Sequence, residues 1–259
     1  MKLTHFGCSF AVGNAIPRHI PGLKSSAFVP RRKKERMALE QKYNIDLSRP
    51  TNCGRVLALR LNLAYKMIAE NGASNERIVR TVLHANLKDT FVLIGFTSHN
   101  RREGLTTARE NKYANRATRW QTWKMVGPKD DTLYKDVRFD PWVNKGEREF
   151  WPAIEEEGQI RTVIQILYLQ NYFKANNIPF LMYNALYNGF DNPLTIECEQ
   201  LLAKVDTTKY FKLQGNFSDT QHGFCLKNKL TVSDLDDHPR MEGHTAWAGE
   251  LLPMAKKIL

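Results

Sequence analysis

The stretch "TFVLIGFTS", Thr90 to Ser98, is an unbroken apolar run that ends in small polar residues. A strand with one wet face alternates apolar and polar side chains, whereas a strand buried on both faces of a parallel sheet is apolar throughout. The stretch therefore predicts a buried strand of a parallel sheet, and it is the clearest strand signal in the chain.

Strands and helices alternate on both sides of this stretch. Short apolar runs predict further strands at 2–7, at the residues ending with Ala69, at 178–183 and at 209–213. Helical spacing predicts helices within 52–62, after an N-cap at Ser74, from Gly158 onward, at 194–205 and at 243–259. The buried stripes expected on two of them are Ile78, Val82 and Leu83, and Ile160, Val163, Ile164, Leu167 and Tyr172. This alternation predicts a doubly wound, mostly parallel α/β sheet with helices on both faces.

The chain of 259 residues is long enough for one large domain, and we expect a single domain over residues 1–259. Residues 14–50 are rich in Pro, Arg and Lys and predict a long connection with one helical piece near 33–42. Residues 100–156 are polar, contain Trp120, Trp123, Trp142 and Trp151, and predict an insertion or lid within the domain.

Composition excludes several classes of protein. A hydrophobic fraction of 42% and five tryptophans argue against disorder. The four cysteines lie far apart, with no CxxC spacing, so we predict reduced thiols and neither a zinc site nor a disulfide framework. No apolar run is long enough to span a bilayer and no signal peptide is evident, so we expect synthesis and folding in a cytoplasm.

The formal net charge of +11 leaves a nucleic-acid partner open. Part of this charge is local, because basic residues concentrate between Lys24 and Arg36, in and just before "PRRKKER". Such a run is usually a solvated loop or helix face, so we rank binding of nucleic acid below the alternatives that follow.

Ligands of doubly wound sheets bind at the carboxyl ends of the strands. The loops expected to meet there carry Cys8 and Ser9 after the first strand, Gly72 and Asn75 after the second, and residues 97–102 after the third. The polar segment "DLDDHPRMEGH", residues 234–244, precedes the last helix and joins this group. Serine, histidine and aspartate are thus predicted to converge at one edge of the sheet.

Three of these segments resemble the ordered blocks of the GDSL/SGNH hydrolases. "FGCSFAVGN" (6–14) is similar to the first block, "ENGASN" (70–75) to the second, and "DDHPRMEGH" (236–244) to the last, in which an Asp shortly precedes a His-Pro pair. "GASNERIVR" (72–80) and "GFTSHNRRE" (95–103) are similar in particular to members from phages and marine microbes. The resemblance spans the chain and implies a flavodoxin-like sheet and a serine esterase.

The resemblance implies a role for each matching residue. Ser9 would be the nucleophile, His238 the base that takes its proton, and Asp236 the acid that orients the imidazole. The oxyanion hole would combine the backbone N–H groups of Ser9 and Gly72 with a side-chain donor, Thr97. Taken singly, each residue also fits a structural role, with Ser9 as a helix cap and His238 as an ordinary loop residue.

The third block departs from the family pattern. The family usually has Gly-x-Asn-Asp, with the Asn donating to the oxyanion, whereas this chain reads Gly-Phe-Thr-Ser at 95–98. Thr97 could donate through its hydroxyl, and Asn75 or Asn100 could substitute for it. Asn75, Asn100 and Arg101 are the predicted substrate-binding residues.

The acid of the triad is open between two neighbours. The family usually places it three residues before the His, where this chain has Leu235. We favour Asp236 over Asp237, because Asp237 directly adjoins His238 and is expected to point away from its imidazole.

The resemblance implies a small acyl ester as substrate, such as an O-acetyl group on a polysaccharide, and no metal or organic cofactor. It also implies a viral protein that acts in a virion or at a host surface. The alternative is an SGNH-fold binding or virion structural protein that has lost activity, and binding of nucleic acid through residues 24–36 ranks last. The sequence predicts no oligomeric state.

Overall fold

The computed structural model describes residues 1–12, 52–69, 73–105, 120–124, 151–233 and 236–259. Its centre is a five-stranded sheet in the order β2-β1-β3-β6-β7, and every neighbouring pair is parallel. The strands are β1 (Lys2–Gly7), β2 (Ala64–Ala69), β3 (Thr90–Phe96), β6 (Phe180–Asn184) and β7 (Tyr210–Phe211). The predicted doubly wound parallel sheet is confirmed, and so are its five strands to within a few residues.

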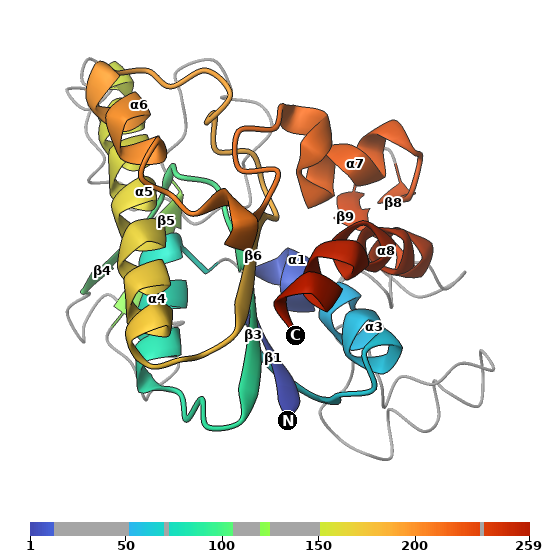
Figure 1. Cartoon of the computed structure of the whole chain (residues 1–259). Helices are drawn as coiled ribbons and strands as arrows, with labels where there is room; N and C mark the ends of the chain where they lie inside the picture. The colour runs from blue at the N-terminus through green and yellow to red at the C-terminus, as the bar shows by residue number, and fades with distance from the viewer. Residues whose placement is uncertain (13–51, 70–72, 106–119, 125–150, 234–235) are drawn as a thin grey trace.

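Helices cover both faces of the sheet (Figure 1). On one face lie α4 (Asn75–His84), α5 (Trp151–Ala175) and α6 (Ile196–Leu202), and on the other lie α3 (Cys53–Arg60), α7 (Gln221–Lys227) and α8 (Met241–Ile258). A short α1 (Ser9–Val12) follows β1, and 3₁₀ turns occupy Thr207–Lys209 and Phe217–Asp219. Two antiparallel hairpins stand apart from the sheet, β4 (Arg101–Leu105) with β5 (Trp120–Lys124), and β8 (Thr231–Ser233) with β9 (Asp236–Pro239).

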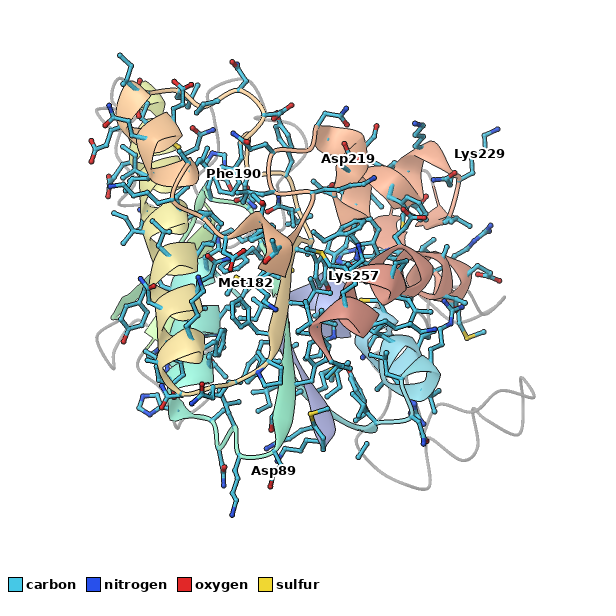
Figure 2. The ribbon with its side chains drawn as sticks, viewed as in Figure 1. Asp89, Met182, Phe190, Asp219, Lys229 and Lys257 are labelled. Carbon is cyan, nitrogen blue, oxygen red and sulfur yellow. The ribbon has the colours of Figure 1, made fainter. Side chains whose placement is uncertain are left out.

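The core lies between the sheet and the two helical layers, where side chains fill the space (Figure 2). All seven residues of β3 are buried, as the apolar run predicts, and β6 is buried throughout as well. Val163, Ile166 and Leu169 of α5 face this core with no exposed surface, and Trp247 of α8 packs on the opposite face.

A polar network crosses the core on the face covered by α3, α7 and α8. The Tyr183 hydroxyl of β6 lies 3.0 Å from Nε2 of His5 on β1 and 3.5 Å from Sγ of Cys53 on α3. It donates to Oε1 of Gln221 on α7 over 3.4 Å, and Gln221 Nε2 lies 3.2 Å from Nδ1 of His244 on α8. One hydroxyl thus connects two strands to the helices of this layer.

The structure differs from the sequence predictions in several elements. Helix α5 begins at Trp151, seven residues before the predicted start, because the helix continues into the segment predicted as an insertion. Leu83 and Ile164 lie on the solvent side of their helices, 37% and 50% exposed, so both predictions of burial are wrong. Helix α7 and the β8–β9 hairpin were not predicted. The predicted helix at 33–42, the basic run and most of the insertion lie outside the described residues.

Gly95 makes room for the Tyr183 hydroxyl. A Cβ at this position would lie 2.6 Å from the hydroxyl oxygen, closer than real contacts allow. We therefore expect Gly95→Ala to lower the free energy of unfolding by about 1–3 kcal/mol, the usual cost of overpacking a core. Urea denaturation measures the change.

The matched control for this substitution is Gly249→Ala in α8, where the Cβ would meet just the end of the Arg60 side chain at 3.3 Å. Since alanine favours a helix over glycine, this control should be neutral or stabilising. Equal destabilisation by the two substitutions would contradict the role given to Gly95.

Burial also makes His5 a source of acid sensitivity. It is fully buried, and desolvation lowers its pKa from 6.5 to about 3. Between these two values the unfolded chain binds the proton and the folded protein does not, so stability falls as the pH falls, with a slope of up to about 1.4 kcal/mol per pH unit from this group. The slope measured by urea denaturation between pH 7 and pH 4.5 should be smaller in His5→Gln and unchanged in His84→Gln, an exposed histidine. Parallel pH profiles of wild type and His5→Gln would exclude this assignment.

Candidate active site

The first part of the site is the turn at the carboxyl end of β1. Gly7 ends the strand, and a Cβ there would lie 2.6 Å from that of Ala11 and 3.1 Å from the Gly95 carbonyl oxygen. Glycine thus allows α1 to fold back closely onto the strand, and the Ala11 amide donates to the Cys8 carbonyl oxygen over 2.9 Å. Ser9 is the first residue of α1, so its backbone stands at the edge where sheets of this topology bind ligands. Its side chain lies outside what the structure describes.

The second part is the β8–β9 hairpin, which carries His238. The imidazole of His238 stacks on the ring of Phe10, with centroids 4.9 Å apart and an interplanar angle of 26°. Phe10 directly follows Ser9 in α1. The hairpin thus brings His238 against the residue that follows Ser9, although Ser9 and His238 are more than 220 positions apart in the sequence.

Asp237 connects this hairpin to α7. Its Oδ2 lies 2.8 Å from Nε2 of His222, and its Oδ1 lies 3.8 Å from Nδ1 of His238. The contact with His222 holds the pKa of the Asp237 carboxyl below its usual value, although partial burial acts in the opposite direction. The carboxylate therefore faces both imidazoles, whereas the sequence predicts that it points away from His238.

Two predicted residues fall outside these observations. Asp236 begins β9, but its side chain is not among those described, so its predicted role as the triad acid stays a prediction. Gly72 lies outside the described residues altogether.

Asn75 joins the loop before α4 to the end of β3. Its Oδ1 accepts from the Thr97 amide over 2.9 Å, and its Nδ2 donates to the Thr97 carbonyl over 3.1 Å and to Oγ1 of Thr162 over 3.2 Å. Both amide hydrogens are used inside the protein, and the residue is 2% exposed. This geometry favours a structural role for Asn75 over the predicted contact with substrate.

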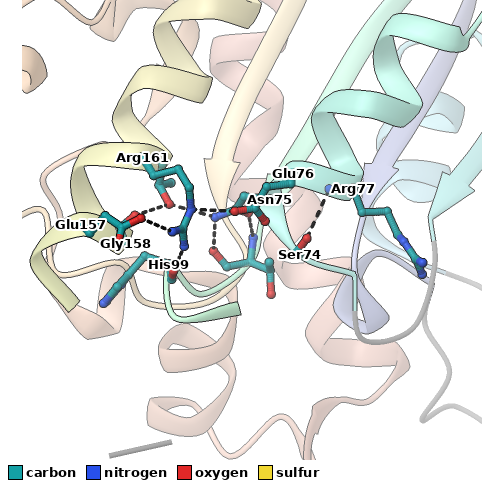
Figure 3. Close-up of polar contacts among 10 residues, drawn as sticks. Ser74, Asn75, Glu76, Arg77, His99, Glu157, Gly158 and Arg161 are labelled. Atoms are coloured by element: carbon teal, nitrogen blue, oxygen red, sulfur yellow. Dashed lines mark hydrogen bonds and ion pairs between the residues drawn. The ribbon is translucent and has the colours of Figure 1, made fainter. Parts of the chain in front are cut away.

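Next to Asn75, Arg161 of α5 forms an ion-pair cluster with Glu76 and Glu157 (Figure 3). Arg161 Nε lies 2.6 Å from the Glu76 carboxylate, and its Nη2 donates to the His99 carbonyl over 3.1 Å. Burial and the neighbouring guanidinium lower the pKa of His99 to about 4. Arg161 thus fixes the loop after β3 against the first turn of α4, whose N-cap is Ser74 as predicted.

Three more predicted residues lie in this loop. Thr97 is fully buried, and its hydroxyl has no hydrogen-bond partner among the described residues. Asn100 accepts from the Ser98 hydroxyl over 2.8 Å, and Arg101 Nη1 lies 3.5 Å from the Ala73 carbonyl oxygen. Of the three side chains, that of Thr97 is the one that makes no hydrogen bond to another described residue.

A cavity of about 150 Å³ adjoins the carboxyl ends of β1 and β2. Its lining includes Gly7, Met67, Ala69 and Ala73, with Arg77 and Thr81 from α4. Within the described residues, no group of three or more His, Cys, Asp or Glu side chains is arranged to hold a metal ion. No helix in that part of the chain has the length and hydropathy needed to cross a membrane.

Comparison with known proteins finds similarity in structure alone. No family model and no curated protein matches the chain. A lipase, Lip_vut3, from a goat rumen metagenome has a TM-score of 0.48 at 13% identity, with 98% of this chain and 97% of that one covered. The acetyl xylan esterase Est2A from Butyrivibrio proteoclasticus has 0.46 at 12% (99% and 63% covered), and a carbohydrate esterase family 2 enzyme from Corynascus thermopiles (Myceliophthora fergusii) has 0.44 at 13% (99% and 66% covered). These values are too low to assign a family.

The Asn75 contacts give a prediction for stability. Asn75→Ala removes the partners of the Thr97 amide and carbonyl and leaves both buried, which should cost about 1–3 kcal/mol of unfolding free energy per unpaired group. Urea denaturation measures the loss. Asn86→Ala, at an exposed turn, is the matched control and should change stability little. Similar stabilities for the two variants would show that Asn75 does not hold this loop.

Proposed function

We propose that this protein is a serine ester hydrolase of the SGNH type. Ser9 attacks the ester carbonyl, His238 takes the serine proton and returns it to the leaving alcohol, and water releases the acyl group in a second, equivalent step. The observation that carries the proposal is the stacking of His238 on Phe10, because it brings the predicted base to the residue that follows the predicted nucleophile.

The position in the sheet supports the same assignment. Ser9 follows β1, the strand between β2 and β3, at the point where successive connections leave for opposite sides of the sheet. Such a switch point leaves an opening at the carboxyl ends of the strands, where catalytic residues of doubly wound folds gather. His238 is 26% exposed, so its ring remains accessible to a substrate.

The oxyanion hole proposed for this site consists of the backbone N–H groups of Ser9 and Gly72 and the hydroxyl of Thr97. That buried hydroxyl has no hydrogen-bond partner within the described part of the chain, which supports its assignment as a donor. A preorganised donor of this kind contributes about 2.7–4 kcal/mol to the stabilisation of the transition state.

Two carboxylates compete for the role of triad acid. Asp236 has the spacing that the family resemblance favours, whereas Asp237 has an oxygen 3.8 Å from Nδ1 of His238. We keep Asp236 as the proposed acid and Asp237 as the alternative. A loss of activity in Asp236→Asn that greatly exceeds the loss in Asp237→Asn is the expected result.

The proposed substrate is a small acyl ester, such as an O-acetyl group on a polysaccharide. The cavity of about 150 Å³ beside Gly7 and Ala73 could hold a small acyl chain and little more, which supports this choice. The competing proposal, an inactive binding or virion protein with the same fold, predicts neither hydrolysis nor a reactive serine.

Hydrolysis of p-nitrophenyl acetate tests the proposal. Replacing the nucleophile in Ser9→Ala should reduce kcat by about 10³-fold or more, because the remaining groups cannot form the acyl-enzyme. Mass spectrometry after treatment with a fluorophosphonate should find one covalent adduct, on Ser9, in wild type and none in the variant.

Ser98→Ala is the matched control, since Ser98 lies in the neighbouring loop and bonds to Asn100. This variant should still form the adduct at Ser9. If the wild type forms no adduct and hydrolyses the ester no faster than Ser9→Ala, the hydrolase proposal is wrong, and the competing proposal of an inactive binding protein is favoured.

A further inference from the structure

A second histidine, His222, lies beside the proposed catalytic pair. Its Nε2 contacts Oδ2 of Asp237 at 2.8 Å, and its ring meets Phe10 edge-on at 5.4 Å. Phe217, in the 3₁₀ turn before α7, also meets the His222 ring edge-on, with centroids 5.2 Å apart. Two aromatic rings and one carboxylate thus fix the orientation of this imidazole.

His222 is itself anchored to the central sheet. Its backbone amide donates to the Ala185 carbonyl over 3.1 Å, and the Ala185 amide donates to the Phe96 carbonyl at the end of β3 over 2.8 Å. The backbone of His222 therefore has a defined position relative to β3 and β6. Its side chain contacts Asp237, which precedes His238 in β9, and so connects β9 to this fixed backbone.

The β8–β9 hairpin needs such an attachment. It lies outside the five-stranded sheet, and its β8–β9 pairing has a register irregularity between Thr231 and Ser233. Its base is held where the Arg240 amide donates to the Leu230 carbonyl over 2.9 Å. That bond joins the two ends of the hairpin to each other, whereas the contact between His222 and Asp237 joins the hairpin to α7, next to His238.

We infer that His222 is a positioning residue for His238, acting through the carboxylate of Asp237. The contact sets where β9 lies over α1, and so it sets how the His238 ring stacks on Phe10. The catalytic consequence rests on the proposed hydrolase function, whereas the positioning itself does not. The Nε2 of His222 faces Asp237, so this nitrogen is directed at the carboxylate and not at a substrate.

The first test is spectroscopic and independent of activity. Stacking on Phe10 displaces the ring-proton resonances of His238 through the ring current, so NMR of the full chain reports the arrangement, with His238→Gln providing the assignment. His222→Ala should move these resonances. His222→Gln, whose amide can reach the position of Nε2, should restore them, and His84→Ala, an exposed histidine, should have no effect.

The second test is kinetic. A misplaced base should lower kcat for p-nitrophenyl acetate by about 10- to 100-fold in His222→Ala, with KM little changed, because orientation and not binding is lost. His222→Gln should recover most of kcat. Asp237→Asn examines the same contact from its other side, and adding His222→Ala to it should cost little more, since the two residues act as one unit. Unchanged thermal unfolding separates positioning from a loss of folding.

Each outcome has a distinct meaning. Unmoved His238 resonances in both His222→Ala and Asp237→Asn would overturn the inference, whatever the activity. If His222→Ala and His222→Gln were both as inactive as Ser9→Ala while His238→Gln kept its activity, His222 would be the base and the inference would be wrong. If the resonances move as expected but wild type forms no adduct at Ser9, the positioning stands and the hydrolase proposal fails.

Discussion

The Tyr183 hydroxyl is the constraint on which the helical layer nearest His238 depends. It contacts His5 and Cys53 and donates to Gln221, which in turn contacts His244. Because such buried polar groups are costly when unpaired, the members of the network stabilise one arrangement of strands and helices over its alternatives. Helix α7 begins at Gln221, so the residue that joins this network is followed directly by His222.

The opposite face of the sheet is held by a different device. There the Asn75 amide pairs with both backbone groups of Thr97, and Arg161 connects the same loop to Glu76. The sheet is thus connected to both helical layers, to one through the Tyr183 network and to the other through Asn75 and Arg161.

The sequence predicts those features that depend on neighbours along the chain. The apolar run of β3 and the N-cap at Ser74 each follow from a few adjacent residues, and both are confirmed. Asn75 and Thr97 are 22 positions apart, and His222 and Asp237 are 15 apart, so no pattern of neighbouring residues predicts either contact. The apolar pattern does not predict helix α7, which has seven residues and begins with the polar Gln221 and His222. Ile164 fits an apolar stripe by spacing, but Ile166 and Leu169 supply the buried face of α5 instead.

The contacts of Asn75 bear on how residues 95–98, which resemble the third SGNH block, would act in the proposed hydrolase. With both of its hydrogens bonded to Thr97 and Thr162, this amide cannot also donate to a substrate. The Thr97 hydroxyl, by contrast, is buried and has no hydrogen-bond partner among the residues that the structure describes, a state that typically costs about 1–3 kcal/mol. In the proposed oxyanion hole, this hydroxyl would gain a hydrogen bond when negative charge develops on the attacked carbonyl, so it would contribute more in the transition state than in the resting protein. In the proposed site, the Asn75 amide would fix the backbone at Thr97. The Thr97 hydroxyl would take the place of the asparagine that donates to the oxyanion in the family pattern.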